Sequence, residues 1–303
     1  MERVLLTVDA GGTFFKYALV TENYKLIFEG ERPANSDGSL QDIEQAWRGL
    51  IREALAQNEK LGKVLSRMVI STPGPYDFAN GCPLMKHKFT AAYGVSVLPW
   101  LHTELPDAPV SFLHDSTAFL LGQMHFGAAK DAKNPAAVTL GTGFGFGCAK
   151  DGRVLVNAAQ SSYVSVWNKP FRTGITEDYV SRRAIRANYQ ALSGCEADDL
   201  PDVKEIAERA QAGETAAIET FKQMGEALGE ILRPVLTSLN ADKLVIGGQI
   251  AKAHALFLPY ALPNISCAVA PAQGGTDTAL LGAAIFCMLG TEKTICIEKN
   301  NEF

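Results

Sequence analysis

The sequence has 303 residues, of which 47% are hydrophobic and 20% are charged, as in an ordinary globular protein. The formal net charge of −5 argues against a basic surface that would attract nucleic acid or anionic lipid. No apolar run reaches the roughly 18 residues of a membrane-spanning helix, and MERVLLTVDAGG is typical of a strand and a turn instead of a signal peptide. We therefore expect a cytoplasmic protein without membrane or nucleic-acid partners.

The first half of the chain alternates strands and helices. Short apolar or alternating runs predict strands, and apolar residues at helical spacing predict helices. In chain order the expected elements are three strands, a helix, two strands and a helix, at residues 3–9, 14–20, 24–30, 40–61, 67–72, 110–113 and 117–129.

The pattern then restarts with a strand, a glycine-rich turn and two further strands. The expected elements of this half are strands at 136–141, 144–150, 153–156, 243–248 and 265–270, and helices at 176–191, 202–212, 214–239, 249–258 and 278–289. Pro234 is expected to bend the longest helix near its end. Two units that each begin with strand, glycine turn and strand suggest a duplicated α/β architecture, with the ligand expected in the cleft between the halves.

Glycines recur at every second position in LGTGFGFG, which holds Gly141, Gly143, Gly145 and Gly147. Each glycine inside a strand costs on the order of 0.5–1 kcal/mol relative to alanine, so the run forgoes roughly 2–4 kcal/mol. The backbone N–H groups around Gly141, Thr142 and Gly143 offer a site for a phosphate, which is our interpretation of the run. The alternative is a tight turn with close packing against another backbone.

The turn in VDAGGTFFK has the same character at the start of the chain. Gly11 and Gly12 can bring backbone amides to a phosphate, and the Thr13 hydroxyl is a further donor. Asp9 would meet a phosphate only through a divalent cation, and Mg²⁺ suits this arrangement because it keeps most of its waters. The alternative for Asp9 is a turn stabilised by its own side chain.

Several common site motifs are absent from the sequence. No Walker A pattern occurs, and GTGFGFG opens onto a strand and does not match the dinucleotide-binding fingerprint. The cysteines form no C-x-x-C or C-x-C pair, which argues against a zinc knuckle or a thioredoxin-type redox site; they are Cys82, Cys148, Cys195, Cys267, Cys287 and Cys296. We expect buried thiols in a reducing compartment.

Taken in order, the motifs DAGGTFFK, STPGP, LHDST, LGTGFGFG, LVIGG and DTALLGAA resemble the ROK family of sugar kinases and sugar-sensing repressors. The likeness runs from about residue 4 to about residue 289. It implies a two-domain actin-like ATPase fold (ribonuclease H-like), with mixed-sheet α/β halves around a cleft that holds sugar and nucleotide. The implied domains are a small one over 1–115 and a larger one over 116–276, with a final helix at 277–290 that packs back on the first.

The resemblance also assigns functional residues. Residues 9–13 match the first phosphate loop, in which Asp9 would hold Mg²⁺ through water; 141–143 match the second loop, and Gly247–Gly248 match the adenosine-contacting turn. Asp115 in LHDST matches the catalytic base, which accepts the proton of the sugar hydroxyl and contributes about 10²–10⁴-fold to the rate. From the residues alone, the first interpretation of Asp115 is the N-cap of a helix, and the resemblance reverses that preference.

The sugar-binding half departs from the family. Zinc-carrying members have a C-x-C-G-x-x-G-C-x-E run, but WNKPFRTGITE lacks every cysteine, so we expect no structural zinc. Glu177 matches the glutamate that ends that run and contacts sugar hydroxyls; its alternative is an acidic residue in a first helical turn. Gln160 and Tyr163 replace the family's glutamate and histidine in the sugar pocket. In MKHKFT, the basic residues 86–88 are either a solvated loop or contacts for an acidic substrate group.

Two functions follow from the resemblance. The first is an ATP- and Mg²⁺-dependent, glucokinase-like sugar kinase that phosphorylates a hydroxyl of a hexose or hexose derivative, with polyphosphate as an alternative donor. The second is a non-catalytic sugar-binding regulator or degenerate kinase. ROK repressors carry a helix-turn-helix before the kinase-like part, and this chain starts at the first strand, so we expect no DNA binding. ROK proteins are often dimers, and the resemblance implies a homodimer.

Overall fold

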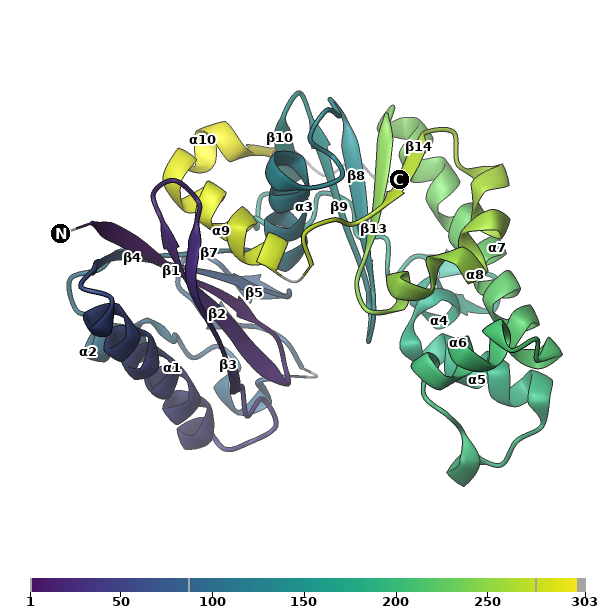
Figure 1. Cartoon of the computed structure of the whole chain (residues 1–303), viewed down its shortest axis with the longest axis horizontal. Helices are drawn as coiled ribbons and strands as arrows, with labels where there is room; N and C mark the ends of the chain where they lie inside the picture. The colour runs from purple at the N-terminus through teal and green to yellow at the C-terminus, as the bar shows by residue number, and fades with distance from the viewer. Residues whose placement is uncertain (1, 87, 276, 299–303) are drawn as a thin grey trace. The chain divides into compact units, whose positions relative to one another are not determined.

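The computed structural model of the chain forms two compact units (Figure 1). It describes residues 2–86, 88–275 and 277–298. Within these ranges, unit 1 contains the chain up to Gly127, residues 153–163 and the chain from Gly274, and unit 2 contains residues 128–152 and 164–273. The domain boundary expected after residue 115 stays a prediction, and unit 1 continues through the following helix to Gly127.

Unit 1 is built on a five-stranded mixed sheet. Its strands are β1 (Arg3–Ala10), β2 (Phe14–Thr21), β3 (Leu26–Pro33), β4 (Val64–Thr72) and β7 (Val110–His114). They lie in the order β3-β2-β1-β4-β7; the pairs β1–β2 and β2–β3 are antiparallel, whereas β1–β4 and β4–β7 are parallel. The remaining elements are α1 (Leu40–Lys60), β5 (Tyr76–Asp77), β6 (Cys82–Pro83), η1 (Thr90–Ala92), α2 (Leu98–Glu104), α3 (Asp115–Phe126), β10 (Arg153–Val156), α9 (Asp277–Leu289), α10 (Thr291–Thr294) and β15 (Ile295–Ile297).

The central strand β1 places alternate side chains on the two faces of this sheet. Leu6 belongs to a buried core that includes Trp47 of α1. Leu5 belongs to a second core, which includes Leu280 of α9. Each such buried side chain contributes about 1.5–3 kcal/mol, so helices on both faces hold the strand whose carboxyl end carries the first glycine turn.

Helices α3 and α9 pack closely because two glycines remove side chains from their contact. A Cβ atom at Gly122 would overlap the backbone of Thr278, and one at Gly282 would overlap the carbonyl oxygen of Ala118. Helix α9 also packs on β1 and β4. It therefore holds α3, and with it Asp115, against the sheet.

Unit 2 repeats the mixed arrangement of strands. Its sheet contains β8 (Pro135–Leu140), β9 (Phe144–Lys150), β13 (Lys243–Gly247) and β14 (Ala268–Pro271). Strands β14, β13 and β8 are parallel neighbours, and β9 is antiparallel to β8. The remaining elements are β11 (Pro170–Phe171), β12 (Gly174–Ile175), α4 (Glu177–Val180), α5 (Arg182–Ser193), η2 (Ala197–Asp199), α6 (Val203–Gln211), α7 (Thr215–Ser238), η3 (Ile250–Ala253), α8 (His254–Ala261) and η4 (Leu262–Asn264). Strand, glycine turn and antiparallel strand recur in both units, which confirms the predicted duplication.

Most expected elements form within a few residues of their predicted bounds, but helix α2 and several short elements were not predicted, and three further regions differ. The helix expected over 176–191 is divided into α4 and α5, because Ser181 is extended and caps α5 with its side chain. The helix expected over 249–258 begins as a 3₁₀ helix and continues to Ala261. Strand β15 forms near the C-terminus, where no element was predicted, and pairs with β10.

The cysteines correct one expectation from the sequence. Only Cys148 is buried, and the other five are partly exposed. Burial raises the pKa of Cys148 to about 12, so this thiol is inert at neutral pH. In the part of the chain that the structure describes, no helix combines the length and apolar character needed to cross a bilayer.

Candidate active site

The carboxyl ends of three parallel strands meet at one edge of the unit 1 sheet. Asp9, near the end of β1, pairs with Ser71 of β4, and Thr72 of β4 pairs with His114 of β7. Asp115 follows at once as the first residue of α3. Ligands of open α/β sheets bind at this edge. The register therefore brings Asp9 and Asp115, which lie far apart in the sequence, into one site.

The Asp9 carboxylate carries a poorly compensated negative charge. Its Oδ1 accepts a hydrogen bond from the Ser71 hydroxyl at 3.4 Å. Burial, and then the negative charge of Asp115, raise the pKa of Asp9 to about 6, although Lys16 and the Ser71 hydroxyl act in the opposite direction. The turn that follows is closed by the backbone bond from Gly11 N–H to the Asp9 carbonyl oxygen, at 3.1 Å, and not by the Asp9 side chain.

The first glycine turn presents two consecutive amides. The Gly11 N–H is used within the turn, whereas the N–H groups of Gly12 and Thr13 donate to no group among the described residues. A Cβ atom at Gly12 would lie 2.6 Å from Cδ of Lys88, so the lysine side chain crosses the turn in close contact. Adjacent free amides of this kind form a concave site for phosphate oxygens.

Asp115 is oriented by the start of α3. Its Oδ1 accepts a hydrogen bond from the Ser116 N–H at 2.6 Å and lies 3.0 Å from Nδ1 of His114. Burial acts to raise the pKa of Asp115, but His114, the Ser116 N–H and Lys88 outweigh it, and the pKa lies below its usual value. The side chain is 44% exposed, so an ionised carboxylate is open to a ligand. The N-cap of α3 is His114, so the alternative that Asp115 is the cap is wrong.

The STPGP turn and the loop after β10 converge on the start of α3. A Cβ atom at Gly74 would lie 3.2 Å from Nε2 of His114 and 3.5 Å from Oγ of Ser161, so the STPGP turn contacts both segments. The hydroxyl oxygens of Ser116 and Ser162 are 3.0 Å apart. The STPGP turn, the start of α3 and the loop after β10 are therefore neighbours within unit 1.

Gln160 and Tyr163 lie in the loop after β10 in different settings. Gln160 is partly exposed and has a φ of 56°, a left-handed conformation that is uncommon outside glycine; its N–H donates to the Asn157 carbonyl oxygen at 2.9 Å. Tyr163 is 8% exposed and belongs to the buried residues of the chain. The loop lies beside α3, and contact of either side chain with a sugar stays a prediction.

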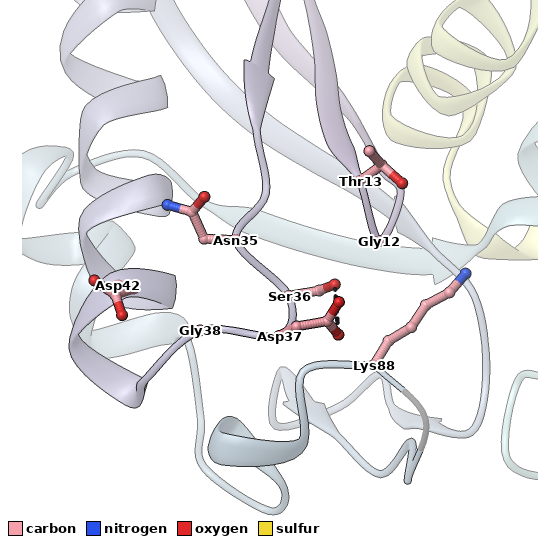
Figure 2. A pocket seen from close by; sticks show the side chains of 8 residues that line it. All are labelled: Gly12, Thr13, Asn35, Ser36, Asp37, Gly38, Asp42 and Lys88. Carbon is pink, nitrogen blue, oxygen red and sulfur yellow. Dashed lines mark hydrogen bonds between the residues drawn. The ribbon is translucent and has the colours of Figure 1, made fainter.

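A cavity of about 600 Å³, which was not predicted, opens beside the first glycine turn (Figure 2). Its lining residues are Gly12, Thr13, Asn35, Ser36, Asp37, Gly38, Asp42 and Lys88. Figure 2 shows Lys88 extending from its loop toward the Gly12–Thr13 turn. Polar residues such as those of ANSDG are typical of any surface turn, so no signal in the sequence identifies this loop as part of a site. Of the neighbouring basic residues, Lys86 is exposed and His87 lies outside the described residues.

The second glycine turn, in unit 2, resembles the first in having two consecutive backbone N–H groups that are not used within the turn. The Gly141 N–H donates to the Gly143 carbonyl oxygen at 3.1 Å, and the N–H groups of Thr142 and Gly143 have no acceptor within the described ranges. A Cβ atom built at Gly141 meets no described atom within 4 Å, so the turn is open on that side. Gly145 is explained by packing instead, because a Cβ atom there would overlap the Thr139 hydroxyl.

Glu177 lies against this second turn. Its Oε2 accepts a hydrogen bond from the Phe144 N–H at 3.0 Å and would lie 2.8 Å from a Cβ atom at Gly143. Glu177 is also the first residue of α4, as the alternative interpretation of an acidic first turn requires. Its predicted contact with sugar hydroxyls stays a prediction.

Gly247 and Gly248 lie at the carboxyl end of β13, beside the end of β8. Gly247 pairs with Thr139 of β8, and Gly248 has a φ of 89°. A side chain at Gly248 would overlap the carbonyl oxygen of Leu140, the residue that precedes the second glycine turn. The two predicted nucleotide segments of unit 2 are therefore adjacent, and backbone packing alone requires a glycine at position 248.

The described residues contain no group of three or more His, Cys, Asp and Glu side chains arranged to hold a metal ion. Mg²⁺ needs fewer protein ligands, because it keeps several waters and is held by one or two carboxylates together with substrate phosphates. The unit 1 site fits such an ion, since burial and then the charge of Asp115 raise the pKa of Asp9, and a divalent cation would offset both effects on its carboxylate.

Comparison with known proteins reveals relatives with two kinds of activity. The glucokinase of Thermotoga maritima is 25% identical over 311 residues, covering 92% of this chain and 96% of the relative. The DNA-binding transcriptional dual regulator NagC of Escherichia coli K12 is 26% identical over 161 residues, which cover 48% of this chain and 39% of NagC. Each name states the activity of the relative, and this chain is similar to both proteins.

The fold and the family are established by the remaining matches. A ROK family glucokinase from Streptomyces griseus, solved in complex with glucose and AMPPNP, superposes with a TM-score of 0.74 at 20% identity, covering 93% of this chain and 98% of that chain. The likeness confirms the predicted actin-like ATPase fold. The ROK family model matches residues 5–159 and 171–288, which is most of the sequence. The chain therefore belongs to the ROK family.

Proposed function

We propose that this protein is an ATP- and Mg²⁺-dependent sugar kinase that transfers the γ-phosphate to a hydroxyl of a hexose or hexose derivative. Membership of the ROK family and likeness to the Thermotoga maritima glucokinase support a carbohydrate kinase. The observation that carries the proposal is the placement of Asp9, Asp115 and the free amides of Gly12 and Thr13 at one edge of the unit 1 sheet. A base, a cation-binding carboxylate and phosphate donors are the parts that phosphoryl transfer needs.

In this proposal Asp115 is the general base. Its lowered pKa keeps the carboxylate ionised at neutral pH, so that it can accept the proton of the attacking hydroxyl. The hydroxyl oxygen forms a bond to the γ-phosphorus, the bond from that phosphorus to the bridging oxygen breaks, and ADP leaves. A positioned base of this kind contributes about 10²–10⁴-fold to the rate.

The donor is held by the glycine turns. We propose that residues 9–13 bind its phosphates, with Gly12 and Thr13 as the amide donors and Asp9 holding Mg²⁺ through water. The cation, when bound, neutralises charge on the donor phosphates. In unit 2, residues 141–143 would bind phosphate through their own free amides, and Gly247–Gly248 would contact the adenosine.

The acceptor site is the part in which this chain differs from its family. We propose that Gln160, Tyr163 and Glu177 contact the acceptor, in addition to Asp115. Glutamine and tyrosine can hydrogen-bond sugar hydroxyls, but they lack the charge of the carboxylate and imidazole that they replace. Since a changed polar partner can alter substrate discrimination by orders of magnitude, we expect an acceptor preference different from that of relatives with the glutamate and histidine.

A phosphorylation screen tests the proposal. Neutral, amino, N-acetylated and acidic sugars are each supplied with ATP and Mg²⁺, and ADP release is followed in a coupled assay. We expect turnover with at least one hexose or derivative. Asp115→Asn should abolish it while nucleotide affinity stays within a few-fold, and the exposed Asp107→Asn is the matched control. An Asp115→Asn variant with wild-type turnover would exclude the assigned base.

Two alternatives give different results in the same screen. The likeness to NagC favours a sugar-binding regulator, which would bind a sugar in calorimetry without releasing ADP. A polyphosphate-dependent glucokinase would turn over with polyphosphate and not with ATP, which would overturn the nucleotide assignment. We further propose that the protein acts in the cytoplasm as a homodimer. Light scattering would then give twice the chain mass of 32.6 kDa.

A further inference from the structure

Lys88 lies at the proposed reaction centre. A Cβ atom at Gly12 would lie 2.6 Å from Cδ and 2.9 Å from Cε of this lysine, so its side chain runs along the first glycine turn. Lys88 is partly buried and lines the cavity beside the turn (Figure 2). Lys88 forms no close ion pair and no hydrogen bond with any described residue, and its charge acts on the Asp115 carboxylate from a longer distance. A partly buried cation without a close partner is suited to bind an anionic ligand.

The backbone after Lys88 fixes the direction of its side chain. Phe89 has a φ of 52°, in the left-handed region that a bulky residue adopts only where the surrounding structure holds it. Its ring is 3% exposed and stacks on Phe15 with centroids 6.0 Å apart, and its N–H donates to the Ser36 carbonyl oxygen at 2.9 Å. These contacts hold the strained residue in place, and Lys88 is thereby directed to the glycine turn instead of to solvent.

We propose that Lys88 is a catalytic residue that contacts the transferred phosphoryl group, an inference that rests on the proposed kinase function. The phosphoryl group must lie within reach of the Gly12 and Thr13 amides, which bind the donor phosphates in that proposal. It must also lie next to the hydroxyl whose proton Asp115 accepts. The Lys88 side chain runs along the same turn, and its charge acts on the same carboxylate.

The chemistry of the step gives this cation a function. The γ-phosphorus gains a bond to the acceptor oxygen and loses its bond to the bridging oxygen of ADP, and negative charge is spread over its equatorial oxygens. A lysine ammonium acts on these oxygens as a fixed positive point charge. The charge on these oxygens changes as the reaction proceeds. An ammonium group placed beside them therefore stabilises the transition state more than it stabilises the complex with the bound substrates. Loss of Lys88 should therefore lower kcat and leave the KM for the acceptor nearly unchanged.

Steady-state kinetics with matched variants tests this. Lys88→Met keeps most of the aliphatic chain and removes the charge, Lys88→Arg restores a cation, and the exposed Lys86→Met is the control. With the best acceptor of the screen, we expect kcat of Lys88→Met to fall about 10²-fold while KM changes by less than about threefold. Lys88→Arg should recover at least about a tenth of the activity, and Lys86→Met should match the wild type. Wild-type kcat in Lys88→Met would overturn the proposal.

Calorimetry separates this inference from the kinase proposal itself. AMPPNP carries the terminal phosphoryl position that ADP lacks, so Lys88→Met should weaken AMPPNP binding about tenfold and change ADP binding by less than about twofold. If wild-type AMPPNP binding depends on Lys88 but no sugar is phosphorylated, the kinase proposal fails and the contact with the terminal phosphoryl stands. If the enzyme is active and Lys88→Met keeps both its kcat and its AMPPNP affinity, only the assignment of Lys88 fails. A wild type that binds neither nucleotide overturns both.

An acidic acceptor is the other source of an anion for Lys88. If Lys88→Met loses turnover with acidic sugars alone, keeps wild-type kcat with neutral sugars and binds AMPPNP normally, the lysine recognises the acceptor and the proposal is overturned. Thermal melting of each variant checks that the fold is retained. A low kcat in a Lys88→Met variant that melts with the wild type, and that Lys88→Arg restores, supports the contact with the phosphoryl group.

Discussion

Replacing Asp9 with asparagine should stabilise the ligand-free protein while abolishing turnover. The carboxylate lies at the end of β1, where its charge is opposed by burial and by the charge of Asp115. Asparagine has nearly the same shape and remains neutral, so it removes the electrostatic cost without opening a cavity. It also removes the proposed cation-binding carboxylate, and we expect ADP release to fall to background. A gain in stability together with a loss of activity is typical of substitutions at charged groups that serve a function.

The size of the stabilisation expected for Asp9→Asn follows from the difference in the pKa of Asp9 between the unfolded and the folded chain. Burial and Asp115 raise the pKa of Asp9 from 3.8 in the unfolded chain to about 6 in the folded protein. Well below pH 3.8 the carboxyl group is protonated in both states, and ionisation costs nothing. As the pH rises from about 4 to about 6 the unfolded chain ionises first, so the folded state loses stability, and above about pH 6 the loss is complete. A tenfold change in proton affinity is worth about 1.4 kcal/mol, so the total is roughly 3 kcal/mol before solvent screening.

Urea unfolding without Mg²⁺ or nucleotide measures this effect. At about pH 7.5 we expect Asp9→Asn to exceed the wild type in free energy of unfolding by about 1–3 kcal/mol, and at about pH 4 we expect the difference to fall below about 1 kcal/mol. The exposed Asp107→Asn is the control and should alter neither value. A gain of the same size at both pH values, or no gain at about pH 7.5, would refute the reasoning.

Gly248→Ala should destabilise the protein by about 2 kcal/mol or more, because its φ of 89° disfavours a side chain and a Cβ atom would overlap the Leu140 carbonyl oxygen; an unchanged urea midpoint would contradict this. Glu177→Gln keeps an acceptor for the Phe144 N–H but removes a negative charge beside the second glycine turn, so calorimetry should show AMPPNP binding strengthened by a few-fold. Weaker AMPPNP binding in Glu177→Gln would contradict the proposal that a phosphate of the nucleotide lies near this turn. Asp115→Asn should lower kcat by at least about 10²-fold, and a pH–rate profile identical to that of the wild type would assign the base elsewhere.

The fold was largely predictable because its signals are local. Alternating apolar residues and glycines located β1, β2, β8 and β9 to within about two residues, since strand periodicity depends only on neighbours in the chain. The division of the helix over 176–191 was missed. Whether Ser181 continues a helix or leaves it to cap the next one depends on packing, which the helical pattern of the residues does not record.

The roles of the candidate site residues stay predictions, and the sequence did not determine the environment of those residues. Glycines and an acidic residue in the turns pointed to Asp9 and the two phosphate turns, whereas the role of Asp115 came from the resemblance to the ROK family. The sequence did not decide which amides of each turn are free. The Gly11 and Gly141 N–H groups are used within their own turns, a consequence of backbone geometry that composition does not determine.

The amino-acid order by itself determined the duplicated strand–turn–strand units, the ROK membership and the residue types at the glycine turns. Only the tertiary structure decided that Lys88 lies along Gly12 with its charge acting on Asp115, contacts between residues separated by many positions in the chain. The parallel register of β1, β4 and β7 and the buried ring of Phe89 set those distances. Electrostatic interactions depend on distance and burial, so the raised pKa of Asp9 and the effect of the Lys88 charge on Asp115 arise only when the chain is folded.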